Sequence, residues 1–314
     1  MAKILIYALL FVSLALAVRA SIKGLKNLPP YVGPLGRTWY IIFRVICGAI
    51  LLYLITPILV IIPLSFNSEP YFTYPMPGFS LRWYEDFLTG EQSSIWHLAI
   101  KNSIIVAIFA TLLATALGTV AAVGLSNSRL PGKTLLMGIL ISPMIVPLVI
   151  TAVGMYFFYS SLGITPRQLS EYWSGLHLLP VIIAHAALGT PFVVITVTAT
   201  LVGFDQSLTR ASASLGADGL RTFFKITVPL VLPGMISGAL FAFITSFDEV
   251  VVVLFLAGIE EYTIPRRMFS GMREQISPTI LSVATVLVVL SIFLLTALEL
   301  LRRRNERMRG MTPG

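Results

Sequence analysis

The chain has 314 residues, of which 56% are hydrophobic and only 11% are charged, and its mean hydropathy is +0.89. This composition excludes an ordinary soluble domain and indicates an all-α polytopic membrane protein. The net charge of +8 does not call for a nucleic-acid partner, because most basic residues fall in segments that one orientation places in the cytosol, as the positive-inside rule expects. With a single cysteine, Cys47, the chain can build neither a disulfide framework nor a cysteine metal site by itself.

The N-terminal segment, residues 4–18, is apolar and is followed by basic residues from Arg19 onwards. It is short for a span and has no convincing small-residue cleavage site, so we expect an extra helix, spanning or lying at the interface, in preference to a removed signal peptide. The expected division is therefore residues 1–36, this helix and a Pro/Gly-rich linker, and residues 37–314, a transmembrane domain.

Six further segments have the length and hydropathy of core spans. They cover residues 41–64, 99–125, 135–159, 178–202, 231–257 and 280–300. In this layout both flanks of the domain are cytosolic, and the C-terminus carries the basic run Arg302–Arg304, which is typical of a cytosolic stop. The external segments hold more acids than bases, which agrees with this orientation.

Small residues in two spans predict close helix packing. The second span carries alanine or glycine at every fourth position from Ala110 to Ala122, and the fifth carries the GxxxG pair Gly234 and Gly238. His185 in the fourth span is expected to be packed and hydrogen-bonded in preference to serving as a ligand.

The third span contains two prolines. Pro143 and Pro147 interrupt its helical regularity.

The external segment after the first span contains FSLRWYEDFL, residues 79–88, which predicts a short amphipathic helix. Trp83 and Tyr84 taken alone fit an aromatic interface belt equally well.

The long polar stretch between the fourth and fifth spans, residues 203–229, is predicted to be a helix-turn-helix on the cytosolic side. A helical run around Ala211 ends at Gly216, since glycine commonly ends a helix where the chain turns. A second short helix follows, with apolar side chains on one broad face. These are Leu220, Phe223, Phe224 and Ile226. Two short helices outside the bilayer are suited to docking into a partner protein.

The spacing of this loop resembles the EAA loop of ABC-importer permeases, which reads E-A-A, three residues, G, nine residues, I, one residue and L-P. In that family the loop forms the coupling helix that sits in a cleft of the ATPase subunit. The resemblance implies coupling residues Arg210, Ala211, Ser212, Gly216, Ala217, Phe223, Ile226 and Pro229. The motif's glutamate is Arg210 here and its second alanine is Ser212, so the chain departs from the family in the charge contact with the ATPase and keeps the spacing.

Two carboxylates fall within the fifth predicted span, in Ser246–Glu249. A charge at membrane depth costs about 2.5 to 3.5 kcal/mol on insertion scales, so it normally faces a water-filled cavity or a partner charge. Because successive helical residues differ by about 100°, Asp248 and Glu249 cannot both point squarely into one pore. One is expected to line the path while the other pairs elsewhere, with Arg266 or Arg267 as a candidate partner.

Phe247, Asp248, Glu249 and the Val-rich run after them resemble the SFD-D/E segment of spermidine/putrescine-type permeases, and the similarity extends weakly over residues 40–300. The resemblance implies the type I ABC-importer permease fold, with six core transmembrane helices, in the lipid of the bacterial inner membrane. It also implies three partners: an ABC ATPase pair, a second permease subunit and an extracytoplasmic solute-binding protein. A polyamine such as putrescine or spermidine could pass Asp248, aided by the faces of Phe243 and Phe247.

Other interpretations stay open. The acids could instead form structural salt bridges to the partner subunit or gate, and the solute could be a phosphonate, an opine, iron or a sugar. A secondary transporter is disfavoured, because the sequence has no convincing internal repeat and the EAA-like loop would have no task.

An enzyme is not expected. His97, His177 and His185 have no metal spacing, and no nucleophile-base pair is apparent. The string PGKT, residues 131–134, lacks the glycine that a phosphate-binding loop needs, since Asn127 stands there. We therefore predict a non-catalytic translocation subunit with no cofactor and no metal, in which a separate chain hydrolyses ATP.

Overall fold

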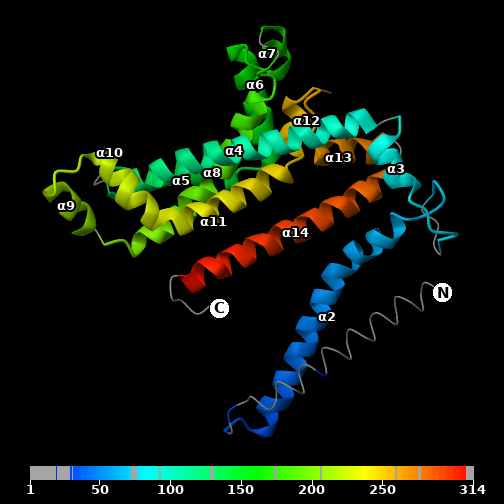
Figure 1. Cartoon of the computed structure of the whole chain (residues 1–314), viewed down its shortest axis with the longest axis horizontal. Helices are drawn as coiled ribbons and strands as arrows, with labels where there is room; N and C mark the ends of the chain where they lie inside the picture. The colour runs from blue at the N-terminus through cyan, green and yellow to red at the C-terminus, as the bar shows by residue number, and fades with distance from the viewer. Residues whose placement is uncertain are drawn as a thin grey trace. The chain divides into compact units, whose positions relative to one another are not determined.

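The computed structural model describes most of the chain as helices joined by short turns (Figure 1). The described residues are 19, 29, 31–71, 76–91, 93–127, 131–172, 175–205, 207–258, 260–274 and 277–308. Among them, the β structure is confined to an isolated bridge between Asn67 and Phe79, so the all-α prediction is confirmed. The helix predicted over residues 4–18 lies outside the described residues.

The chain divides into two compact units, residues 1–93 with 274–314, and residues 94–273. The helices of the first unit are α2 (Pro34–Leu64), α3 (Arg82–Thr89) and α14 (Pro278–Met308). Those of the second unit are α4 (Ser93–Asn127), α5 (Lys133–Ile141), α6 (Leu148–Leu162), α7 (Pro166–Tyr172), α8 (Leu179–Val202), α9 (Ser207–Ser214), α10 (Gly219–Thr222), α11 (Val228–Phe247), α12 (Val251–Leu256) and α13 (Ile264–Glu274). A 3-10 turn, η1 (Ser142–Met144), follows α5, and a π-helical turn, η2 (Phe223–Thr227), joins α10 to α11.

In the first unit, the short helix α3 is the predicted amphipathic helix, and it packs against α14. Trp83 and Phe87 are buried, so Trp83 belongs to the packed interior of this unit and not to an exposed aromatic belt. Thr279 Oγ1 donates to Asp86 Oδ2 at 2.7 Å, and Ser282 Oγ donates to the Trp83 carbonyl at 3.1 Å. These bonds attach α3 to the first turns of α14.

Five of the described helices are long and apolar enough to cross a membrane. They are Pro34–Leu64, Ser93–Ser126, Leu148–Glu171, Leu179–Val202 and Gly219–Phe247. The first, second and fourth predicted spans are therefore confirmed as long apolar helices. The apolar part of α14, Pro278–Phe293, is shorter.

The third predicted span is not one regular helix. The structure ends α5 at Ile141, passes through η1, and begins α6 at Leu148. Pro143 and Pro147 explain the break, because each lacks the N–H that would continue the helical hydrogen bonds. The Pro147 carbonyl then accepts the Ile150 N–H at 2.9 Å in the first turn of α6.

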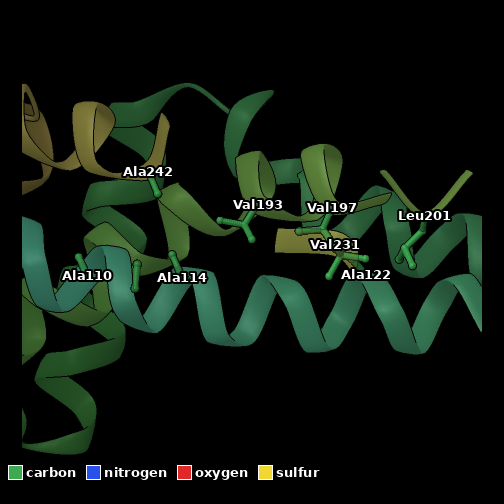
Figure 2. Packing of buried hydrophobic residues seen from close by; sticks show 9 residues of the cluster. Ala110, Ala114, Ala122, Val193, Val197, Leu201, Val231 and Ala242 are labelled. Atoms are coloured by element: carbon green, nitrogen blue, oxygen red, sulfur yellow. The ribbon is translucent and has the colours of Figure 1, made fainter. Parts of the chain in front are cut away.

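The core of the second unit is built around α8, which packs closely against α11 (Figure 2). Small and β-branched residues from α4, α8 and α11 fill it: Ala110, Ala114, Ala122, Ala186, Val193, Val197, Leu201, Val231 and Ala242. A Cβ placed on Gly118 would lie 2.7 Å from the Val193 Cβ, and one on Gly189 would lie 2.9 Å from the Ala242 Cβ. The close packing predicted from the small residues is thus confirmed.

The GxxxG pair of α11 also meets α8, where Gly234 faces Thr200 and Gly238 faces Thr196 and Val193. We expect Gly238→Ala to destabilise the protein by roughly 1 to 3 kcal/mol, because its Cβ would lie 2.7 Å from the Val193 Cα and the backbone must move. The matched control is Gly154→Ala in α6, where nothing lies within 4 Å of the added Cβ.

Thermal unfolding in detergent checks this prediction. The control should melt at or above the parent temperature, since alanine is the better helix former. A Gly238→Ala protein that melts together with the control would contradict the close approach of α11 and α8.

Candidate functional sites

The predicted helix-turn-helix is present and begins with α9. This helix ends at Ser214, and the turn after it contains Gly216, whose φ of 79° is the left-handed conformation that glycine adopts without strain. The Gly216 N–H donates to the Ala213 carbonyl at 3.0 Å, and the Ala217 N–H donates to the Ser212 carbonyl at 3.1 Å. This pair of bonds is a Schellman ending, and it satisfies carbonyls that the last helical turn would otherwise leave free.

Side-chain hydrogen bonds hold the two helices together. Ser212 is buried, and its hydroxyl shares a hydrogen bond of 2.8 Å with Thr222 Oγ1. Asp218 caps α10 by accepting the Arg221 N–H at 2.6 Å. We call residues 207–227 the two-helix knob, and these contacts give it a defined internal geometry.

The start of the knob is also capped. Asp205 accepts hydrogen bonds from the Ser207 hydroxyl and the Ser207 N–H, at 2.7 and 2.8 Å. Both bonds hold the pKa of the Asp205 carboxyl below its usual range, and the bond from the hydroxyl has the larger effect. The carboxylate therefore stays ionised at the N-terminus of α9, where the helix dipole favours a negative charge.

The second short helix was expected to end before the fifth span, but in the structure it does not. The helical conformation runs from Gly219 through η2 into α11 and ends at Phe247. Within η2 the Val228 N–H donates to the Phe223 carbonyl, a bond that spans five residues. The wider turn lies just before Pro229, which has no N–H to donate. The wider turn therefore lets the chain continue as a helix past the proline.

The residues predicted for coupling differ in exposure. Arg210, Ala211, Gly216 and Pro229 are exposed, Ser212 is buried, and Ala217, Phe223 and Ile226 are half-buried. The apolar face predicted for the second helix is therefore only partly exposed. Leu220 and Phe224 are exposed, whereas Phe223 and Ile226 are half-buried.

Large exposed side chains form the outer surface of the knob. Leu215 is 88% exposed, although it was not among the predicted coupling residues. Its position directly before Gly216, at the end of the first helix of the loop, was the sequence signal that could have marked it. Three cations, Arg210, Arg221 and Lys225, are exposed on the same segment.

The two acids of the fifth predicted span, Asp248 and Glu249, lie where that span breaks. The span was expected to continue to residue 257, but α11 ends at Phe247 and α12 begins at Val251. Glu249 is buried, and its Oε1 accepts the Val252 N–H at 2.8 Å, so its carboxylate caps α12. Asp248 is exposed, and its N–H donates to the Ile244 carbonyl at 3.1 Å. The carboxylates thus face different surroundings.

The two sides of this break have different surroundings. Val252 and Leu256 of α12 lie in one cluster with Ala152 and Tyr159 of α6 and with Ala184 and Leu188 of α8. On the α11 side, Phe243 and Phe247 are half-buried and stack with ring centroids 5.7 Å apart and planes 14° apart. The aromatic pair therefore lies in the last turn of α11, directly before Asp248.

The segment after α12, expected to be a loop, contains α13. Pro265, the second residue of α13, was the available sequence signal for its start. Thr263 precedes it, but the Thr263 hydroxyl has no hydrogen-bond partner among the described residues and does not cap the helix. Arg266, one of the proposed partners of the acids, instead donates to Ser270 Oγ and to the Tyr262 hydroxyl, and its guanidinium lies over the Tyr262 ring. Arg267, the other proposed partner, lies over the Trp96 ring.

Two buried residues of α4 attach this segment to the core. Asn102 donates to the carbonyls of Glu260 and Tyr262, at 2.7 and 3.2 Å. The Ser103 hydroxyl accepts the Ile264 N–H at 2.8 Å. Sequence reasoning assigned no contact to this pair, because the partners are backbone groups about 160 positions away along the chain.

His185 of α8 is buried, and its Nδ1 shares a hydrogen bond of 2.9 Å with Ser246 Oγ of α11. The expectation of a packed, hydrogen-bonded histidine is confirmed. Within the described part of the chain, no group of three or more His, Cys, Asp or Glu side chains could hold a metal ion.

Comparisons with known proteins agree with one another. Residues 114–307 match the family described as "Binding-protein-dependent transport system inner membrane component". The spermidine/putrescine transport system permease protein PotC of Haemophilus influenzae is 33% identical, over 81% of this chain and 93% of that protein. The putrescine transport system permease protein PotI of Escherichia coli K12 is 31% identical, over 84% of this chain and 89% of that protein.

A solved structure is similar in fold. It is the crystal structure of a bacterial ABC transporter involved in the import of the acidic polysaccharide alginate, with a TM-score of 0.63 at 15% sequence identity. The match covers 85% of this chain and 96% of that chain.

Proposed function

Because the chain belongs to the family of binding-protein-dependent transport system inner membrane components, we propose that it is the permease subunit of an ATP-driven importer whose solute is a polyamine such as putrescine or spermidine. It is a multi-pass protein of the bacterial inner membrane. In this proposal it supplies half of the translocation pathway and no chemistry, and its C-terminus lies in the cytosol.

The observation that carries the polyamine proposal is the exposed carboxylate of Asp248, which directly follows in the chain the helical turn that holds the stacked rings of Phe243 and Phe247. A polyamine is a chain of ammonium groups joined by methylenes. A carboxylate attracts the ammonium groups, and aromatic faces attract both the cations and the methylenes. Relatives named as spermidine/putrescine permeases support the same solute class.

The two acids have separate roles in this proposal. Asp248 meets the solute. Glu249 is assigned a structural role, because its carboxylate is buried and already accepts the Val252 N–H. This division follows the expectation that only one of two neighbouring acids lines the path.

Three partners complete the importer. An ATPase pair hydrolyses ATP and holds the two-helix knob, a second permease subunit supplies the other half of the pathway, and an extracytoplasmic solute-binding protein delivers the polyamine. The knob is suited to this task because the Ser212–Thr222 bond and the Schellman ending fix its shape. Closure of the ATPase pair would move the knob and, through α11 and the closely packed α8, rock the spans between inward-open and outward-open states.

Transport by the reconstituted importer tests the proposal. With the ATPase, the second permease and the binding protein present in proteoliposomes, we expect ATP-dependent accumulation of radiolabelled putrescine or spermidine. The binding protein that co-purifies with the permease should bind the same polyamine with micromolar or tighter affinity.

Two results would count against it in different ways. Polyamine uptake that persists without the ATPase would overturn the ATP-driven mechanism. A binding protein that takes a sugar or an anion and ignores polyamines would leave the permease subunit in place, overturn the solute, and reassign Asp248 to structure or gating.

A further inference from the structure

His185 is almost fully buried, at 1% exposure, and only one of its two ring nitrogens is engaged. Nδ1 shares the hydrogen bond with Ser246 Oγ, whereas Nε2 has no hydrogen-bond partner among the described residues. Burying a polar imidazole is costly unless it is hydrogen-bonded, so the bond to Ser246 is the contact that compensates for its burial. The imidazole therefore ties α8 to α11 at a defined point.

That point is the last turn of α11. Ser246 precedes Asp248 by two residues, and α11 ends between them at Phe247. One helical turn below, Gly189 of α8 allows the backbone to approach Ala242 of α11, where an added Cβ would lie at 2.9 Å. The end of α11 is thus held to α8 by close packing at Ala242 and by a hydrogen bond at Ser246.

The chain beyond the break is held separately from α11. α12 is capped by Glu249, and Val252 and Leu256 pack against both α6 and α8. Asp248 therefore lies at a joint between the last turn of α11, which the Ser246 bond ties to α8, and the packed helix α12. Loss of the Ser246 bond would let the last turn of α11, and the carboxylate that follows it, move.

We propose that His185 is a positioning residue for solute passage, holding the last turn of α11 through Ser246 so that the Asp248 carboxylate stays exposed to the solute. The inference rests on the proposed function, in which Asp248 meets a polyamine. His185 does not touch the solute. It acts through Asp248.

The free Nε2 makes the proposal specific. An asparagine side chain can place a hydrogen-bonding atom near the position of Nδ1 but cannot reach that of Nε2. Because Nε2 has no partner among the described residues, His185→Asn should preserve the role of the histidine, whereas His185→Leu should not. Ser246→Ala removes the same bond from the other side with the loss of one oxygen atom.

The first readout is uptake by the complete importer. His185→Leu and Ser246→Ala should each raise the KM for spermidine about threefold to tenfold with little change in kcat, and His185→Asn should restore the parent KM. His97→Leu is the matched control, since His97 is an exposed histidine of α4. In an Asp248→Asn background the effect of Ser246→Ala on KM should disappear, because the two residues act on one step.

The second readout does not depend on the solute. With Cys47→Ser removing the native thiol, Asp248→Cys places a single cysteine at the joint, and its rate of labelling by a water-soluble thiol reagent is measured in the assembled importer. His185→Leu and Ser246→Ala should slow labelling at least threefold, while His185→Asn should not.

An unchanged or faster labelling rate in both His185→Leu and Ser246→Ala would overturn the inference, whatever the solute. Failure of the proposed function has a different signature. In that case spermidine is not transported by the parent importer, while labelling of the cysteine at position 248 still slows in the two variants.

Discussion

Replacing Gly216 by proline is expected to abolish ATP hydrolysis that is stimulated by the binding protein, while the protein still inserts in the membrane. Proline fixes φ near −65°, whereas Gly216 has a φ of 79°, so the turn cannot form. The substitution also removes the N–H that donates to the Ala213 carbonyl. Together these losses amount to roughly 3 kcal/mol, enough to displace α9 from α10. Stimulated ATPase activity in proteoliposomes should fall at least about tenfold.

Two further substitutions make the test quantitative. Gly216→Ala keeps the N–H but must adopt a left-handed conformation, at a cost of about 1 to 2 kcal/mol, so its activity should be intermediate. Gly219→Ala lies in the same knob, has no positive φ and meets nothing within 4 Å, so it is the matched control. Parent-level stimulation in Gly216→Pro would refute a coupling role for the knob.

Neutralising Asp248 should have the second large effect. Asp248→Asn keeps the size of the side chain and removes its charge, so we expect polyamine uptake, as kcat/KM, to fall about tenfold. A charge pair near a protein surface contributes about 1 to 4 kcal/mol, depending on the local dielectric, and the lower part of that range corresponds to this loss. Uptake of radiolabelled spermidine at a concentration below KM is the measurement.

The neighbouring acid provides the control. Glu249→Gln keeps an oxygen that can accept the Val252 N–H, so its uptake should fall less than about threefold. Glu249→Ala leaves that N–H without its acceptor and should lower stability by about 1 to 3 kcal/mol, seen as a lower melting temperature. If the Asp248→Asn, Glu249→Gln double variant took up polyamines at the parent rate, neither acid would act on the solute.

The sequence allowed the long helices to be predicted because each depends on a local property, the run of apolar residues between charged flanks. Close packing on the small-residue faces of α4 and α11 could also be predicted, since small residues at every fourth position let two helix backbones approach. That the helix packed there is α8 came only from the structure. The turn at Gly216 followed from the conformational freedom of glycine.

What could not be predicted depends on competition between contacts far apart in sequence. The break at Asp248 arises because Glu249 caps α12 instead of continuing α11, and no local pattern distinguishes the two outcomes in an apolar stretch. The attachment of α13 by Asn102 and Ser103 was missed for the same reason, because the acceptors and donors on the partner segment are backbone groups.

The exposed apolar side chains of the two-helix knob also affect how the subunit behaves when it is expressed alone. Leu215, Leu220 and Phe224 are 88%, 73% and 65% exposed on one short segment. Exposed apolar groups of this kind promote aggregation when nothing covers them. If the knob docks into an ATPase as proposed, a subunit produced without that partner leaves these groups exposed to proteases and aggregates on extraction. Co-expression with the ATPase should therefore raise the yield of monodisperse protein.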